Sequence, residues 1–111
     1  MPLDYSSGIL NKMKINLYKI KDGKLETWLE WGNLLETTYK EEAVETLKEE
    51  GVTTEAFGLF ELNGENYTLG ISMGENLPAN LKKEINIKHK EVKKECLIFI
   101  KKVDLVYFLQ N

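Results

Sequence analysis

The sequence predicts an α+β fold in which a four-stranded antiparallel sheet carries helices on one face. Three observations lead to this prediction: segments in which apolar and polar residues alternate, regions with helical spacing, and an Asn-Gly turn between two strand-like segments. The expected order of elements is strand, helix, strand, strand, helix, strand. This βαββαβ order closes as a ferredoxin-like sandwich.

The first strand is predicted from Met13 to Ile20, where the side chains alternate up to a turn at Asp22-Gly23. A helix follows, and Trp31 lies off its apolar face, where it would cap a pocket or pack against a partner. A capping-box pattern that begins at Thr38 predicts a second, short helix ending at Gly51. The apolar face of the first helix consists of Leu25, Trp28, Leu29, Gly32 and Leu35.

Two further strands are predicted from Val52 to Leu62 and from Tyr67 to Met73. They form a hairpin, because Asn63-Gly64 is a strong signal for a two-residue turn. With that turn, Phe60 lies opposite Tyr67, and Phe57 lies opposite Gly70. At several positions of the hairpin a large side chain thus lies opposite a small residue.

The last helical pattern runs from Leu81 to Leu97 and contains the only histidine and the only cysteine of the chain. The segment from Leu97 to Ile100 either finishes this helix or begins a connection, and Val103 to Leu109 is predicted as the last strand. The inner stripe of the helix consists of Leu81, Ile85, His89, Val92 and Cys96.

A length of 111 residues is typical of one domain, and we expect residues 13–111 to form it. Residues 1–12 show no clear period, so a disordered tail or vector-derived sequence is expected there. The chain lacks the run of about eighteen apolar residues that a membrane span needs, and it lacks a secretory signal. We therefore expect a cytoplasmic protein without a membrane partner.

The charge pattern argues against a nucleic-acid partner. All 15 basic residues are lysine, and the net charge is −3. Arginine is the residue of bidentate phosphate and base recognition, and nucleic-acid binders usually carry a basic face. A compositional bias of the source explains the missing arginine at least as well.

Apolar residues occur on both faces of the predicted hairpin and of the predicted last strand. Helices cover only one face of such a sheet, and each large side chain left in water would forfeit about 1.5–3 kcal/mol of burial free energy. We therefore expect a homodimer that forms through the open sheet face.

The chain resembles a family of small, uncharacterised bacterial proteins, a domain of unknown function within the dimeric α/β-barrel superfamily. The resemblance runs from about Met13 to the C-terminus and implies the fold and the dimer, but no activity. Asn86 stands where the family pattern tends to have an acid. The matching residues are Tyr18 to Lys24 ahead of Trp28, then Glu45, Leu47 and Glu50 before Glu55, then His89, Lys94-Glu95-Cys96 and Asp104-Leu105.

His89 and Glu55 are the candidate catalytic residues. If Glu55 projects to the helix side of the sheet, the two meet in a cleft, with His89 as acid or base and Glu55 as its orienting partner. A histidine on an apolar face is, however, more often a core residue. Trp28 and Tyr67 are the candidate ligand-binding residues.

No metal site or cofactor is expected. The chain has no second histidine and no second cysteine to complete a cluster with His89. Two helical turns, roughly 10 Å, separate Cys96 from His89, so the two do not form a ready nucleophile and base pair. Cys96 is interpreted as an inert buried thiol, because a reactive cysteine needs exposure and a positive environment.

Three functions follow as hypotheses. The first is a small homodimer that binds an organic ligand in a cleft between helices and sheet. The second is a cofactor-independent enzyme of isomerase, lyase or oxygenase type that uses His89. The third is a structural or regulatory interaction module. A cavity lined by Trp28, Glu55 and His89 would favour the first two, and a filled interior the third.

Overall fold

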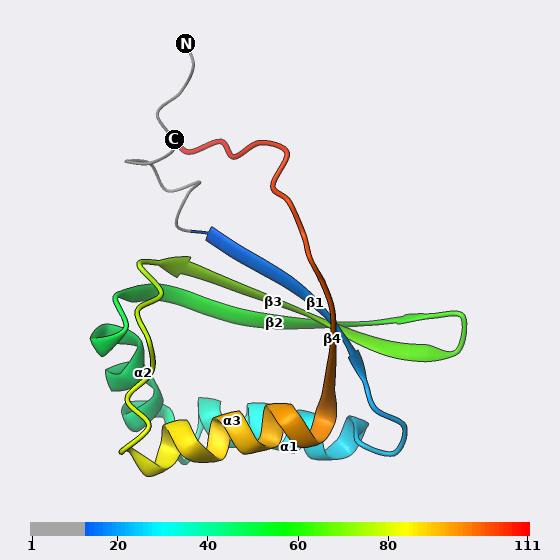
Figure 1. Ribbon diagram of the computed structural model, residues 1–111, viewed down its shortest axis with the longest axis horizontal. Helices are drawn as coiled ribbons and strands as arrows, with labels where there is room; N and C mark the ends of the chain where they lie inside the picture. Colours follow the sequence, from blue (N-terminus) through cyan, green and yellow to red (C-terminus); the bar gives the residue numbers. More distant parts are fainter. Residues whose placement is uncertain (1–12) are drawn as a thin grey trace.

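In the computed structural model, residues 13–111 form a four-stranded antiparallel sheet and three helices (Figure 1). The strands are β1 (Met13–Ile20), β2 (Val52–Leu62), β3 (Glu65–Gly74) and β4 (Leu97–Lys102), and the helices are α1 (Leu25–Glu36), α2 (Lys40–Glu49) and α3 (Glu84–Cys96). This confirms the predicted α+β class. The expectation for residues 1–12 lies outside the described residues.

The sheet order is β2-β3-β1-β4, and every neighbouring pair is antiparallel. Figure 1 shows all three helices on the same side of the sheet. Helices α1 and α3 form a layer that faces the sheet, and α2 stands between that layer and one end of β2 and β3. The other face of the sheet carries no helix within residues 13–111.

The β2–β3 hairpin has the register that the sequence predicts. Asn63 and Gly64 both have positive φ angles, 54° and 78°, as the favoured two-residue hairpin turn requires. Phe60 pairs with Tyr67, and Phe57 pairs with Gly70. This turn and the alternation of the two strands therefore decide which side chains face the helices.

Gly70 provides a test of this packing, because a Cβ atom there would lie 2.6 Å from the ring of Phe57. We expect Gly70→Ala to lower the free energy of unfolding by about 1–3 kcal/mol, the usual cost of overpacking. Gly58→Ala is the matched control on the neighbouring strand, since a Cβ atom there meets nothing within 4 Å. Urea unfolding of both variants checks the prediction, and equal stabilities would contradict it.

The prediction of a last strand from Val103 to Leu109 is wrong, because β4 consists of Leu97–Lys102. Helix α3 ends at Cys96, and Leu97 is already extended, with φ −119° and ψ 145°. The strand forms by pairing with β1, where Leu97 lies opposite Ile20. Such long-range pairing leaves no local signal in an apolar run that follows a helix directly.

Three details of the helices also differ from the expectations. Trp31 is not off the buried face of α1, because only 3% of it is exposed, whereas Leu29 is 47% exposed. Helix α1 packs against both α2 and α3, which widens its buried face. The capping box at Thr38 does not form, because Tyr39 precedes α2 and no side chain caps the helix. Helix α3 begins at Glu84, which leaves Leu81 exposed.

The core lies between the sheet and the layer formed by α1 and α3. It combines the end of β1, the inner faces of both helices and the first residue of β4. No helix within residues 13–111 is both long and apolar enough to cross a membrane. The buried core residues are Ile20, Trp28, Trp31, Val92, Cys96 and Leu97.

Candidate functional site

A cavity of about 620 Å³ lies between the three helices and the helix-facing side of β2 and β3. This volume is within the range of about 300–1,000 Å³ that is typical of small-molecule sites. Its walls are mostly apolar, with carboxylates at Glu36, Glu50 and Glu55 and one ammonium group at Lys40. The apolar part of the lining includes Trp28, Trp31, Leu35, Val44, Leu47 and Phe57.

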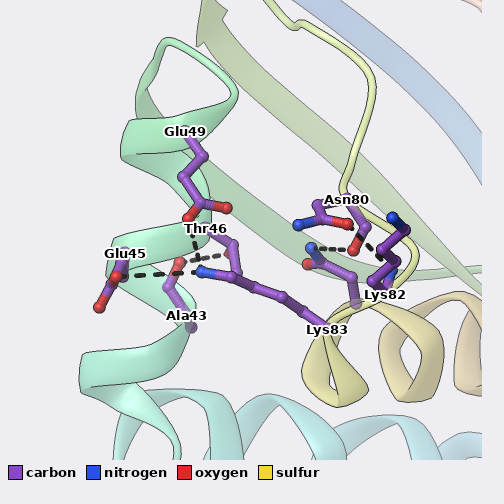
Figure 2. Close-up of polar contacts among 8 residues, drawn as sticks. Ala43, Glu45, Thr46, Glu49, Asn80, Lys82 and Lys83 are labelled. Atoms are coloured by element: carbon purple, nitrogen blue, oxygen red, sulfur yellow. Dashed lines mark hydrogen bonds and ion pairs between the residues drawn. The ribbon is translucent and has the colours of Figure 1, made fainter.

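Polar contacts hold α2 against the start of α3 at one end of this cavity (Figure 2). The ammonium group of Lys83 donates a hydrogen bond to Glu49 and lies 3.9 Å from the carboxylate of Glu45. Two buried lining residues bond to the backbone: the Thr46 hydroxyl donates to Ala43 at 2.7 Å, and the Asn86 amide donates to Asn80 at 3.0 Å. The groups that shape this end are thus already paired.

The structure brings three of the four predicted site residues together. Trp28 on α1, Glu55 on β2 and His89 on α3 all line the cavity, although they are far apart in the sequence. Tyr67 does not line it. Its side chain lies on the open face of the sheet, where its ring stacks on that of Phe60 with centroids 5.3 Å apart.

His89 is half-buried and has a defined partner. The indole N–H of Trp31 donates a hydrogen bond to Nδ1 of His89 at 2.8 Å. Burial and the positive charge of Lys93 lower the pKa of His89 from 6.5 to about 4. The imidazole is therefore neutral at neutral pH, and since Nδ1 accepts, Nε2 carries the proton. The orienting partner is Trp31, whereas the sequence assigned that role to Glu55.

The carboxyl groups of Glu50 and Glu55 both have raised pKa values, and desolvation is the main cause for each. Loss of water contact raises the pKa of Glu50, and the negative charges of Glu55 and Glu49 raise it further. Desolvation also raises the pKa of Glu55, although its side chain is open to the cavity, and the charge of Lys93 opposes this shift. Both groups thus carry negative charge that their surroundings do not favour.

Cys96 is fully buried, and burial raises the pKa of its thiol. A buried thiol of this kind is unreactive, because the thiolate is the nucleophile. Among residues 13–111, no group of three or more histidine, cysteine, aspartate or glutamate side chains is arranged to hold a metal ion.

Sequence reasoning missed the role of Trp31 and the whole of Glu50. Trp31 was expected to cap a pocket or pack against a partner, but its contact with His89, 58 residues away in the sequence, was not foreseen. Glu50 is one of several glutamates around α2, and no local pattern distinguishes it. Its position directly before Gly51, and its place among the residues that carry the family resemblance, were the available signals.

These features define an α+β protein with a cavity of small-molecule size between its helices and its sheet. Residues 12–110 match the model of the family of unknown function DUF6176, and the chain belongs to this family. The match confirms the expected membership of an uncharacterised family. Comparisons with curated proteins and with solved structures give no significant match.

Proposed function

We propose that this protein binds a small organic molecule in the cavity between its helices and β2. The observation that carries the proposal is the cavity itself, in which aromatic walls surround a neutral imidazole and unpaired carboxylates. Binding sites for small molecules combine apolar walls with a few polar groups that orient the ligand. A protein whose only role is to present a surface does not need such a space.

Gly32 offers a way to test this proposal, because it lines the cavity and a Cβ atom there meets nothing within 4 Å. Ligands would be found as metabolites that raise the melting temperature in a thermal-shift screen. We expect Gly32→Phe to fill the space and to remove that rise, whereas Ile87→Phe, on the exposed surface of α3, should preserve it. Unchanged binding by Gly32→Phe would contradict the proposal.

A second candidate function is catalysis of proton transfer in the same cavity, by an enzyme of isomerase or lyase type. The observation that favours it is the combination of a carboxyl group with a raised pKa at Glu55 and an N–H donor at Nε2 of His89. Glu55 would take up a proton, and His89 would hold a substrate oxygen. For a compound found in the screen, binding without turnover by the wild-type protein would count against catalysis.

We also propose that the fold is ferredoxin-like, of the dimeric α/β-barrel type. The central positions of β1 and β3 and the placement of all helices on one face support this assignment. In such an assembly, two copies pack through their open sheet faces.

The open face supports association with a second copy of the chain. Its central positions are apolar and carry no charge, so identical faces can meet about a two-fold axis without opposing like charges. Figure 1 shows residues 103–111 leaving the sheet on this same side, and Val106 is 91% exposed there. The central residues of the face are Ile15, Leu17, Leu69 and Ile71.

Light scattering at micromolar concentration tests the dimer. We expect the wild-type protein to have twice the monomer mass and Ile71→Lys to be monomeric, because the substitution places like charges in the interface. Ile87→Lys, the same change on the exposed surface of α3, should remain dimeric. A wild-type protein that is strictly monomeric would contradict this part of the proposal.

A further inference from the structure

Two carboxylates of the cavity, those of Glu50 and Glu55, have no ion-pair partner, unlike several glutamates elsewhere in residues 13–111. Glu49 is bonded to Lys83, Glu65 lies 2.8 Å from Lys19, and Glu95 lies 2.9 Å from Lys24. Neither Glu50 nor Glu55 forms an ion pair or a side-chain hydrogen bond with any residue in the range 13–111.

A helix terminus adds to the negative potential at this end of the cavity. Glu50 directly follows α2, at the end of the helix where the last carbonyl groups lie. These carbonyls carry the partial negative charge of the helix dipole. Together with the mutual repulsion of Glu50 and Glu55, they make this part of the cavity favourable for a cation.

The aromatic walls are suited to the hydrocarbon part of a ligand. The rings of Trp28 and Phe57 meet edge to face, with centroids 5.2 Å apart, and both line the cavity. The ammonium group of Lys93 lies 5.7 Å from the centroid of Phe57 and 5.4 Å from that of Tyr18, so these rings already have a cation beside them. The indole and the phenyl ring therefore offer the ligand an apolar surface.

Two lysines near the cavity would disfavour a bound cation, and His89 has no charge with which to affect it. Lys40 lines the cavity, and Lys93 acts on Glu55 and His89, so both would repel a cation. His89 is neutral at neutral pH. With Lys93 counted beside Lys40, the three carboxylates of the lining still outnumber the two ammonium groups.

We propose that the ligand of this cavity is a small organic amine in its cationic form. Its ammonium group lies near the carboxylates of Glu50 and Glu55, and its hydrocarbon part packs against Trp28 and Phe57. This inference rests on the proposed ligand-binding function and names its chemical class. An anion held by Lys40 and Lys93 is the alternative that the experiment must distinguish.

Three compounds of similar shape test whether the cavity selects a ligand by its charge. They are phenethylamine, which is a cation at neutral pH, phenethyl alcohol, which is neutral, and hydrocinnamate, which is an anion. Trp28 and Trp31 are the only tryptophans of the chain and both line the cavity, so intrinsic fluorescence reports on its walls. At neutral pH we expect the amine to bind about tenfold more tightly than the alcohol, because its ammonium group forms charge-assisted hydrogen bonds with the carboxylates. The carboxylate should bind most weakly.

Removing the two carboxylates tests their role. The double variant Glu50→Gln/Glu55→Gln should lose about tenfold in amine affinity while binding the alcohol as the wild-type protein does. It should fold, because the substitutions remove a like-charge repulsion. Glu61→Gln is the matched control, since Glu61 is on the same strand but outside the cavity.

The outcomes separate this inference from the function on which it rests. If the alcohol or the carboxylate binds as tightly as the amine, the cavity binds ligands but the inference of an amine is overturned. Absence of binding by all three compounds overturns the inference as well, and the Gly32→Phe comparison then decides the proposed function separately. An amine preference that survives in the double variant overturns the role of Glu50 and Glu55.

Discussion

Replacement of Trp31 by alanine is expected to lower the free energy of unfolding by about 3–5 kcal/mol, the usual cost of deleting a buried indole. Only 3% of Trp31 is exposed, and its ring packs near those of Tyr39 and His89. The substitution also leaves Nδ1 of His89 without its donor. Far-UV circular dichroism in urea measures the loss without relying on tryptophan fluorescence.

Two further variants divide this effect into its parts. Trp31→Phe keeps an aromatic ring but removes the N–H donor, so we expect a smaller loss of about 1–3 kcal/mol. Leu29→Ala is the control on the same helix, where the side chain is 47% exposed, and a change within about 0.5–1 kcal/mol is expected. A Trp31→Ala variant as stable as Leu29→Ala would show that the indole is not part of the core.

The second large effect is a loss of stability at acidic pH caused by His89, whose pKa falls from 6.5 to about 4 in the folded protein. Above pH 6.5 the imidazole is neutral in both states. As the pH falls from 6.5 to about 4, the unfolded chain binds a proton that the folded chain does not, so stability falls. Below that range both states are protonated. The total loss corresponds to about 3 kcal/mol.

A matched variant isolates this contribution. Glu50 and Glu55 have raised pKa values, so the folded protein gains protons on them and they act in the opposite direction. His89→Gln retains both carboxyl groups, and its side-chain oxygen can accept the Trp31 hydrogen bond. Because the chain has one histidine, the difference between the two pH profiles belongs to that residue. Parallel profiles between pH 7 and 4 would contradict the prediction.

The parts of the fold that follow from local sequence were predictable. The Asn63-Gly64 turn sets the β2–β3 register, and the alternation of Met13–Ile20 defines β1. The position of β4 was not predictable in this way. Leu97 to Ile100 follows α3 without a glycine or proline, and the strand is defined by its pairing with a segment about 80 residues earlier.

For the candidate site as well, features set by local sequence were predictable and features set by long-range packing were not. The inward stripe of the last helix placed His89 correctly, whereas Glu55 was expected in the cleft only if it projects to the helix side of the sheet; both residues line the cavity. The partner of His89 was not accessible, because the Trp31 contact depends on how α1 and α3 pack. Tyr67 was a candidate by residue type alone, and the alternation of β3 places it on the other face from Thr68, which lines the cavity.

The direct junction of α3 and β4 has a mechanical consequence. No residue separates Cys96 from Leu97, and the carbonyl of Cys96 accepts a hydrogen bond from the backbone N–H of Lys21 at 2.8 Å. Without a linker, the end of α3 is held by the pairing of β4 with β1, which begins at the next residue with Leu97 opposite Ile20. The sheet therefore anchors the helix that carries His89, and this wall of the cavity is fixed at one end.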